Sequence, residues 1–463
     1  MEELNAHAIT HLIESQKHFY KSSKTRTIAF RKVMLTRLKQ AILDFEPQIT
    51  KALYQDLRKS EQEVITTEIG ITLTEINFML KNLSKWDKEK RVKSTLINFG
   101  AKSYTMREPF GTTLIIGPWN YPFQLAIAPL IGAIAGGNTA VIKPSELSMY
   151  TAKVVEEMIF KTFNPNYIAV VQGGIKETTE LLNHRFDKIF FTGSTQVGSI
   201  VMQSAAKFLT PVILELGGKS PCIIDKNVNL KLAVKRIVFG KGINAGQTCV
   251  APDYVIVHES IKQEFYDEFK RVASLFYGST KQNQMDFGKI INDRNFNRVR
   301  SYLNDGKIVY GGGFTEASHH IDLTLLEIRS LDCSVMKEEI FGPILPVITF
   351  RSIEDIIEIV ECNPDPLALY VFSDDKKFQK EVLRRIHFGG GCINDTIMHL
   401  TNENLPFGGR GTSGLGNYHG KSSFDAFTHE KSISHSPTWF DLKLKYPPLS
   451  KKRVGIIKKI MYK

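Results

Sequence analysis

The chain has 463 residues, a formal net charge of +12, 42% hydrophobic residues and 23% charged residues. This composition is ordinary for a globular protein and excludes wholesale disorder, while the length predicts several domain-sized units. The first ten residues lack the charged start and apolar run of a signal peptide. The most apolar stretch, residues 125–142, contains Pro129, Gly136 and Gly137, so it predicts a buried helix, a turn and a strand rather than a membrane span.

Cysteine usage and charge narrow the function classes further. The five cysteines are widely spread and form no Cys-x-x-Cys pair, which argues against a disulfide framework or a zinc site. We therefore expect a cytoplasmic protein with reduced thiols and no bound metal. The basic excess includes no recognisable nucleic-acid module, so we predict no nucleic-acid partner and interpret most Lys and Arg as solvated surface.

The predicted elements change character along the chain. Up to about Lys90, apolar residues such as Leu35, Leu38 and Ile42 recur at helical spacing and predict a helical region. From Gly111 onward, short β-rich runs alternate with stretches of helix length. The predicted strands are Thr112–Ile116, Thr139–Ile142, Ile168–Val171, Lys188–Phe191, Val212–Leu216 and Cys222–Ile224. The predicted helices are Phe123–Ala135, Glu146–Phe163, Lys176–Asn183 and Thr195–Phe208.

This alternation predicts an α/β fold with a parallel sheet covered on both faces. A similar alternation runs from Val228 to about Asn394 and predicts a second α/β domain. The segment 404–429 is rich in glycine and predicts loops. We find no internal repeat and no low-complexity tract.

A glycine-containing junction follows the predicted strand Lys188–Phe191. Thr192 and Gly193 lead into Ser194 and the next predicted helix. Glycine lets the backbone approach a phosphate, and the start of a helix offers free N–H groups. The junction matches neither the Gly-x-Gly-x-x-Gly pattern nor a P-loop. A tight turn at the edge of a sheet would explain it nearly as well.

Two further segments carry candidate catalytic side chains. Glu215 ends an apolar strand before Gly217 and Gly218, where burial raises a carboxyl pKa and suits it to general-base work. The alternative is a glutamate that caps the Gly-Gly turn. Cys249 follows Thr248 in a short polar loop. A free cysteine is more often a small buried hydrophobe, but a loop cysteine with a nearby carboxylate fits a covalent nucleophile.

The order of these and other segments resembles the aldehyde dehydrogenase superfamily. The resemblance covers nearly all of residues 10–430, and the sequence Cys249–Tyr254 with the short N-terminus is most similar to the class 3 branch, which includes fatty and aromatic aldehyde dehydrogenases. The segments that carry it are Pro118–Pro122, Lys143–Glu146, Phe191–Thr195, Leu214–Lys219, Gly246–Cys249, Glu338–Pro343, Pro406–Gly409 and Tyr418–Lys421.

The resemblance implies NAD(P)-dependent oxidation of an aldehyde to a carboxylic acid through a thioester. Cys249 matches the nucleophile, Glu215 the base that activates the deacylating water, and Asn120 the oxyanion-hole amide, acting with the backbone N–H of Cys249. One such fixed donor is worth ~10²–10³ in rate. The positions that match cofactor contacts are Trp119, Lys143, Glu146, Gly193, Ser194, Thr195, Val197, Gly198, Glu339 and Phe341. Because Glu146 would repel a 2′-phosphate, NAD is the expected cofactor, with NADP also usable.

The same resemblance implies the domain plan and the partners. A Rossmann-like NAD(P)-binding domain is expected at residues 1–91 and 109–217, and a catalytic domain at residues 218–403. A small bridging and oligomerisation element at residues 92–108 and 404–463, which includes the basic tail, implies a homodimer. Class resemblance implies a medium-chain, long-chain or otherwise apolar aldehyde as substrate. No metal is required, and His319 and His320 are expected to be loop residues.

Three alternatives stay open at this point. A CoA-acylating dehydrogenase of the same superfamily is disfavoured by Glu215, since transfer to CoA needs no such base. A thiol esterase would act through Cys249 beside a vestigial dinucleotide site. A non-catalytic binding protein on this fold is disfavoured by the three intact catalytic positions.

Two features call for separate expectations. Many family members carry a bulky residue at the position of Gly242, seven residues before the cysteine, so this glycine either widens the aldehyde tunnel or is compensated by repacking; Ile243 follows it, where an aromatic is also common.

Residues 443–463 hold eight cationic and no acidic side chains, mixed with Ile456, Ile457 and Ile460. This tail predicts peripheral contact with an anionic membrane surface. A disordered or subunit-packed tail that aids solubility is the alternative.

Overall fold

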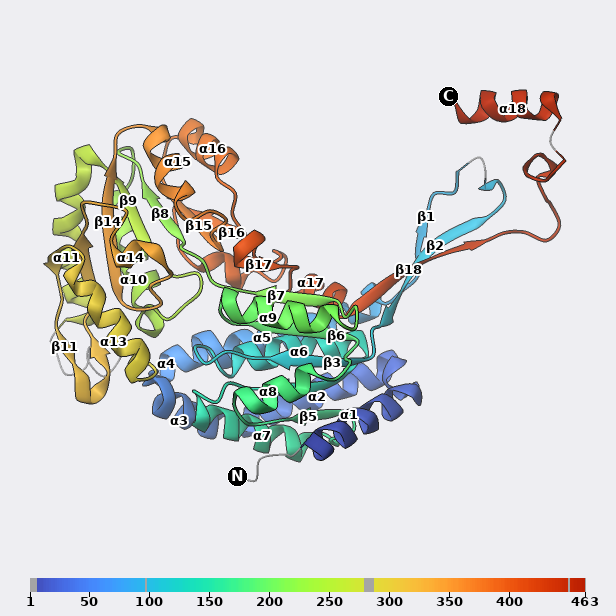
Figure 1. Cartoon of the computed structure of the whole chain (residues 1–463), viewed down its shortest axis with the longest axis horizontal. Helices are drawn as coiled ribbons and strands as arrows, with labels where there is room; N and C mark the ends of the chain where they lie inside the picture. Colours follow the sequence, from blue (N-terminus) through green and yellow to red (C-terminus); the bar gives the residue numbers. More distant parts are fainter. Residues whose placement is uncertain (1–5, 96–97, 279–286, 449, 463) are drawn as a thin grey trace. The chain divides into compact units, whose positions relative to one another are not determined.

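The structure is a computed structural model that describes every residue except 1–5, 96–97, 279–286, 449 and 463 (Figure 1). Its contacts divide the chain into two compact units. The larger comprises Met1–Trp86 and Pro109–His429, and the smaller comprises Asp87–Glu108 and Glu430–Lys463. Within the described residues, we find no helix with the length and apolar character needed to span a bilayer.

The N-terminal region of the larger unit is helical, as predicted. Leu35, Leu38 and Ile42 are fully buried on one stripe of α2, and Thr27 caps this helix by accepting a hydrogen bond from the Phe30 N–H. The elements are α1 (Ala6–Lys21), η1 (Lys24–Arg26), α2 (Ile28–Asp44), α3 (Glu46–Leu57), α4 (Glu61–Val64), the π-helix η2 (Ile65–Ile69) and α5 (Gly70–Trp86).

A six-stranded sheet follows, in the order β17-β7-β6-β3-β4-β5. All neighbours are parallel except β17, which pairs antiparallel with β7. The strands are β3 (Thr112–Ile116), β4 (Thr139–Lys143), β5 (Ile168–Val170), β6 (Lys188–Thr192), β7 (Val212–Glu215) and β17 (Gly414–Leu415). The connecting helices are α6 (Gln124–Gly136), α7 (Met149–Thr162), α8 (Ile175–Leu182) and α9 (Thr195–Ala206). The predicted strands are confirmed to within one residue at each end, and the helices to within three.

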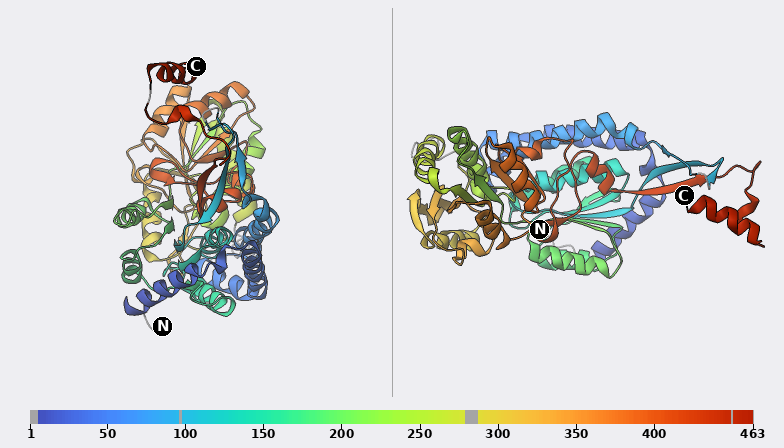
Figure 2. Two further views of the ribbon diagram at one scale, coloured as in Figure 1. Left: turned by 90° about the vertical axis from the view of Figure 1, so that its right-hand side faces the viewer. Right: turned by 90° about the horizontal axis from the view of Figure 1, so that it is seen from above.

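Helices cover both faces of this sheet (Figures 1 and 2). Ile115 belongs to the same core as buried residues of α2, α5 and α6. Its neighbours Leu114 and Ile116 belong to a second core, with residues of α1, α8 and α9. Successive strand residues point to opposite faces, so a strand buried on both sides is apolar throughout. The predicted doubly covered parallel sheet is therefore confirmed.

A seven-stranded sheet in the same unit has the order β10-β13-β14-β9-β8-β15-β16. Only the β10–β13 pair is antiparallel. The strands are β8 (Pro221–Ile224), β9 (Tyr254–His258), β10 (Lys307–Tyr310), β13 (Thr324–Glu327), β14 (Ile344–Phe350), β15 (Ala368–Phe372) and β16 (Gly390–Ile393), and a separate hairpin joins β11 (Phe314–Thr315) to β12 (His320–Ile321). The helices are α10 (Leu230–Gly242), α11 (Lys262–Tyr277), α13 (Asp293–Ser301), α14 (Ser334–Lys337), α15 (Ile353–Glu361) and α16 (Lys376–Arg385). A later helix, α17 (Lys421–Ala426), packs against α6. Short 3₁₀ turns are η4 (Ile243–Gly246), η5 (Glu259–Ile261), η6 (Tyr302–Asn304), η7 (Glu316–Ser318), η8 (Met398–Thr401) and η9 (Gly411–Ser413).

The smaller unit contains a three-stranded sheet in the order β1-β2-β18. Its strands are β1 (Lys90–Val92), β2 (Lys102–Pro109) and β18 (Thr428–His435), followed by η10 (Lys443–Lys445) and α18 (Lys451–Met461). Arg107 pairs with Glu430 at 2.9 Å and Lys431 with Glu108 at 2.7 Å across β2 and β18. The mixed α/β class with a Rossmann-like sheet is confirmed. The division of the larger unit into two domains stays a prediction, because one continuous core includes residues of both sheets.

Candidate active site

The carboxyl ends of the parallel strands bring the predicted segments to one edge of the six-stranded sheet. Ile116 at the end of β3 pairs in register with Lys143 of β4 and Phe191 of β6, and Thr192 pairs with Glu215 of β7. The loop after β3 carries Asn120, and the loop after β6 carries Gly193. Ligands of open α/β sheets bind at this edge because the loops that follow the strands converge there.

A polar cavity of about 430 Å³ lies at this edge. It brings together all three predicted catalytic residues and six of the predicted cofactor residues. Lys143, Glu146, Val197 and Gly198 are not part of its lining. Its lining residues are Pro118, Trp119, Asn120, Leu125, Thr192, Gly193, Ser194, Thr195, Gln196, Glu215, Leu216, Gly217, Cys249, Asn295, Arg298, Glu338, Glu339 and Phe341.

The start of α9 forms one end of this cavity. The Ser194 hydroxyl caps the helix by accepting from the Val197 N–H. A Cβ atom at Gly193 would lie 2.6 Å from the Phe191 ring, so only glycine fits there. A helix N-terminus that opens onto a polar cavity presents backbone N–H groups and a positive dipole end. These residues therefore fit the phosphates of a dinucleotide.

Lys143 and Glu146 lie next to each other beyond β4. The Lys143 ammonium is buried and donates to the Pro144 carbonyl at 2.8 Å, and burial lowers its pKa. Its Nζ lies 3.5 Å from the Glu146 carboxylate, which is about half exposed. An exposed carboxylate beside a buried cation can accept a hydrogen bond from a ribose hydroxyl at the sheet edge.

Glu339 and Phe341 approach the cavity from the segment before β14. A Cβ atom at Gly217 would lie 1.9 Å from Glu339 Oε2, so the glycine admits the carboxylate. Burial raises the pKa of Glu339 well above its ordinary value. The Phe341 and Trp119 rings meet edge to face with centroids 5.2 Å apart. This carboxyl and aromatic wall fits the nicotinamide end of the same dinucleotide.

Glu215 is buried at the end of β7, with an exposed fraction of 2%. Neither of its carboxyl oxygens has a hydrogen-bond partner among the described residues. This burial raises its pKa well above its ordinary value. A carboxyl group held this way has the raised pKa that a general base needs near neutral pH, and no competing bond restrains it.

The loop with Cys249 is built on left-handed backbone. Asn244 and Ala245 both have φ of 50°, which reverses the chain after α10. The Asn120 amide Nδ2 donates to the Gln247 carbonyl at 3.0 Å, tying the loop after β3 to the cysteine loop. The Cys249 side chain is partly exposed because it opens onto a cavity, and the surrounding protein raises its thiol pKa by burial, with smaller contributions from Glu339 and Glu215.

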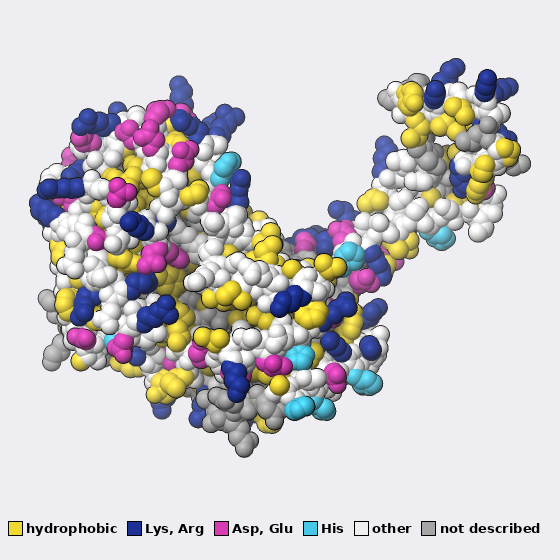
Figure 3. Space-filling view, viewed as in Figure 1, with side chains coloured by type: hydrophobic (Ala, Val, Ile, Leu, Met, Phe, Trp, Pro, Cys, Tyr) yellow, Lys and Arg dark blue, Asp and Glu magenta, His cyan; other side chains and the backbone are white. Residues whose placement is uncertain are grey.

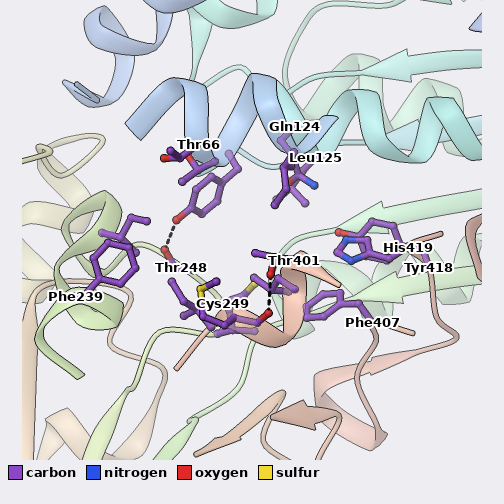
Figure 4. Close-up of a pocket in the computed structure, with 18 residues that line it drawn as sticks. Thr66, Gln124, Leu125, Phe239, Thr248, Cys249, Thr401, Phe407, Tyr418 and His419 are labelled. Carbon is purple, nitrogen blue, oxygen red and sulfur yellow. Dashed lines mark hydrogen bonds between the residues drawn. The ribbon is translucent and has the colours of Figure 1, made fainter. Parts of the chain in front are cut away.

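Cys249 also lines a second cavity, of about 280 Å³ (Figure 4). None of the described residues that line it is acidic, and its one ionisable nitrogen base is His419, whose pKa burial lowers to about 4. This cavity is therefore apolar and uncharged at neutral pH. Its lining residues are Thr66, Thr67, Ile71, Tyr121, Gln124, Leu125, Phe239, Ile243, Thr248, Cys249, Val250, Ile397, Met398, Leu400, Thr401, Phe407, Tyr418 and His419.

Gly242 does not widen this cavity. A Cβ atom there would lie 2.2 Å from the Tyr277 ring, so the tyrosine fills the space next to the glycine. Ile243 and Phe239 instead line the cavity. The repacking alternative is the one observed.

The paired histidines each contact an acidic side chain. His319 lies 2.6 Å from Asp293 and His320 lies 2.9 Å from Asp322. Across the described ranges, no group of three or more His, Cys, Asp or Glu side chains has the arrangement of a metal site.

Several residues of the site carry no signal in the sequence. Arg298 lines the polar cavity and donates to the carbonyls of Glu339 and Ile340 at 3.2 and 3.0 Å. Lys59 is fully buried and donates to the Asn120 carbonyl at 3.0 Å. Neither lies in a recognisable motif, and both act across long sequence separations. For Glu339 the sequence did contain a signal, because the Gly-Gly turn after Glu215 indicates the close approach of another group.

Comparisons with known proteins identify the family of the chain. Residues 1–433 match the aldehyde dehydrogenase family. The chain is 50% identical over 434 residues to the 4,4′-diaponeurosporen-aldehyde dehydrogenase of Staphylococcus aureus, covering 93% of this chain and 95% of that protein. It is 44% identical to aldehyde dehydrogenase family 3 member A2 of Mus musculus, covering 96% and 92%. The solved substrate-bound state of Staphylococcus aureus AldH superimposes with a TM-score of 0.96 at 48% identity, covering 98% and 99%.

The family match, the relatives and the fold agree with one another. Neither a CoA-acylating enzyme nor a thiol esterase is favoured by these findings. The chain belongs to the aldehyde dehydrogenase family, of class 3 type, and is an NAD(P)-dependent enzyme that oxidises an aldehyde.

Proposed function

We propose that Cys249 is the nucleophile, Asn120 the oxyanion donor and Glu215 the base for hydrolysis. The observation that carries this assignment is that Cys249 lines both cavities. One cavity is polar and carries Asn120, Glu215 and the start of α9, while the other is apolar. A reacting carbon bonded to the thiol would therefore have its hydrocarbon in one cavity and its reaction partners in the other.

The chemistry follows from these positions. The Cys249 thiolate adds to the aldehyde carbon, and the alkoxide that forms accepts hydrogen bonds from Asn120 Nδ2 and the Cys249 N–H. When bound, the nicotinamide accepts the hydride, and its cationic ring favours the thiolate. The product on Cys249 is a thioester. Glu215 then takes a proton from water, and the resulting hydroxide attacks the thioester and releases the carboxylic acid and the Cys249 thiolate.

We assign Trp119, Gly193, Ser194, Thr195, Val197 and Gly198 to the phosphate and nicotinamide end of the cofactor, with Glu339 and Phe341 on the nicotinamide ribose. Lys143 and Glu146 hold the adenosine ribose, which favours NAD while still allowing NADP. These roles are supported by the polar lining of the first cavity, by the N-terminus of α9 and by the buried carboxyl group of Glu339.

The substrate is proposed to be an apolar aldehyde of medium or long chain. The uncharged lining of the second cavity supports this class, because transferring a charged group into it costs several kcal/mol. The similar Staphylococcus aureus enzyme is named for 4,4′-diaponeurosporen-aldehyde. The test compares unbranched aldehydes with aldehydes of equal length that end in a carboxylate, by NADH formation at saturating NAD. We expect kcat/KM for the uncharged series to exceed the charged series by about 100-fold, or ~3 kcal/mol. Equal values would refute the assignment.

We further propose a homodimer in the cytoplasm. In the smaller unit, β1 and the eight-residue β18 are the two outer strands of the sheet, and exposed edges of this kind pair readily with a second chain. All five cysteines lie in the described part of the chain and are free thiols, which fits a reducing compartment. Light scattering of the purified chain would test the dimer directly.

The C-terminal helix α18 is proposed to rest on an anionic membrane surface. None of its residues is buried, and Ser450 caps its start. Val454, Ile457 and Met461 follow helical spacing on one side, while lysines gather on the other, and Figure 3 shows basic and apolar side chains together on this segment. The tail's Lys463 and the Lys443 side chain lie outside the described residues. The five cations of α18, Lys451, Lys452, Arg453, Lys458 and Lys459, contribute about 1 kcal/mol each at such a surface.

Vesicle sedimentation tests this contact. The full chain should bind phosphatidylglycerol vesicles at low salt, bind phosphatidylcholine vesicles weakly, and dissociate at high salt. A chain that ends at Tyr446 should not bind. As a matched control, Ile457→Gln with Met461→Gln keeps the charge, removes part of the apolar side and should weaken binding at low salt. Equal sedimentation of the full and shortened chains would show that the tail only aids solubility.

A further inference from the structure

We infer that Lys59 is a positioning residue for the Asn120 amide, and that its buried ion pair with Glu68 sets the rate of the first chemical step. The inference rests on the proposed oxyanion role of Asn120. It adds a residue from the loop between α3 and α4, 61 positions earlier in the chain, to the positioning of the site.

The Lys59 ammonium is fully enclosed by site residues. Its Nζ lies 2.5 Å from Glu68 Oε1, and both side chains have an exposed fraction of 0%. The same Nζ donates to the Asn120 carbonyl at 3.0 Å and lies 3.7 Å from the centre of the Tyr121 ring. The ammonium is therefore held between Glu68 and the loop after β3, and the nearby Glu63 carboxylate also attracts it.

Glu68 fixes the other end of that loop. Its second oxygen, Oε2, accepts from the Gln124 N–H at 2.8 Å, at the first residue of α6. Glu68 lies in the π-helix η2, where the Gly70 N–H bonds to the Ile65 carbonyl. A π-turn shifts the register of a helix, and such turns are frequent at functional sites. The pair thus holds the loop at Asn120 and again at Gln124.

A second hydrogen-bond donor also holds the Asn120 peptide in place. Asn244 Nδ2 donates to the same Asn120 carbonyl at 2.8 Å and to the Gln247 carbonyl at 3.0 Å. The Asn120 amide itself donates to that Gln247 carbonyl. Since Gln247 lies two residues before Cys249, the backbone of Asn120 and the cysteine loop are fixed against each other. One Nδ2 hydrogen of Asn120 is used in this way, which leaves the other for the oxyanion.

Lys59 matters to rate because the amide has to meet an alkoxide that exists only in the transition state and the adduct. A shift of about 1 Å in a positioned group can cost 10²-fold in rate. Without the ammonium, the Asn120 carbonyl keeps only the Asn244 bond, and the peptide is free to rotate about it. Binding of cofactor at α9 does not involve Lys59, so its affinity should not change.

The test is a double-mutant cycle on the full-length enzyme, read as the pre-steady-state rate of NADH formation. Lys59→Met should slow this rate about 10- to 100-fold, and Asn120→Ala about 10²–10³-fold. In the combined variant, Lys59→Met should add less than about threefold, because its effect passes through the amide that is already gone. NAD affinity, measured by fluorescence quenching, should be unchanged throughout. The losses of thermal stability in the two single variants should add up in the combined variant.

Two further variants separate positioning from folding. Lys59→Met/Glu68→Gln removes both charges and keeps an acceptor for the Gln124 N–H. It should therefore fold even if Lys59→Met fails to fold, and its pre-steady-state rate of NADH formation should be as low as that expected for Lys59→Met. Arg31→Met removes a buried cation that donates to the carbonyls of Thr25, Arg26 and Ala135, away from the site, and should lose stability at an unchanged rate. A wild-type rate in Lys59→Met/Glu68→Gln, or additive slowing in the cycle, would overturn the inference alone. A wild-type rate in Asn120→Ala would overturn the oxyanion role and the inference together.

Discussion

Replacing Glu215 by glutamine should separate the two halves of the reaction. The glutamine has the same shape but cannot accept a proton, and the carboxyl it replaces has an exposed fraction of 2% and no hydrogen-bond partner among the described residues. General-base catalysis is worth 10²–10⁴ in rate, so steady-state turnover should fall by that factor, or about 3–5 kcal/mol in barrier. The first turnover should still release about one NADH per active site, because hydride transfer does not need this base.

The stability of the Glu215→Gln variant and the pH dependence of its turnover test the same prediction independently. Burial raises the folded-state pKa of Glu215 above its ordinary value of 4.5, so the ionised form costs folding energy once the pH exceeds that value. The Glu215→Gln variant should therefore be as stable as the wild type, or more stable, at pH 8. Wild-type turnover should rise with pH as Glu215 deprotonates, and that rise should be missing in the variant.

The assay is stopped-flow absorbance of NADH followed by steady-state turnover of the same sample. A burst amplitude near one with slow turnover supports the assignment. If the burst rate falls in parallel with turnover, the reasoning is refuted and Glu215 acts on Cys249 or on the first step instead.

Two other changes test the remaining parts of the site, and a third tests a buried carboxyl group of α5, Glu75, outside both cavities. Cys249→Ala should abolish NADH formation while NAD binding persists in calorimetry; turnover near wild type would remove the nucleophile assignment. Glu146→Gln should shift the kcat/KM ratio toward NADP by about tenfold, since a half-exposed carboxylate near a doubly charged phosphate costs ~1.4 kcal/mol after solvent screening, and an unchanged ratio would contradict this role. Burial raises the pKa of Glu75 from 4.5 to about 6, so the wild type loses about 2 kcal/mol as pH rises through that interval. Glu75→Gln keeps the acceptor for the Gly420 N–H, and its melting temperature should exceed the wild type at pH 7.5 but not at pH 4.5.

The sequence by itself determined the elements and the chemical character of the site. Local apolar spacing predicted β3 to β7 and their helices, because a strand or helix buries its face according to a period of a few residues. The short β17 escaped prediction, since two residues carry no period, and its pairing with Glu215 and Leu214 depends on distant contacts. The segments with Asn120, Glu215 and Cys249 were identified by resemblance. The parallel strands bring Asn120 and Glu215 to one edge, and the loop before β9 brings Cys249 into the same cavity.

Only the tertiary structure decided how these groups meet. Cys249 opens onto one polar and one apolar cavity, a property of two separate packing surfaces that no local spacing encodes. The space next to Gly242 is filled by the Tyr277 ring from α11, which decided between a wider tunnel and repacking, the two alternatives that the sequence left open. Lys59 reaches the Asn120 carbonyl across 61 residues because folding buries its charge beside Glu68. A buried charge needs a partner in three dimensions, and the chain supplies that partner wherever the fold brings it close.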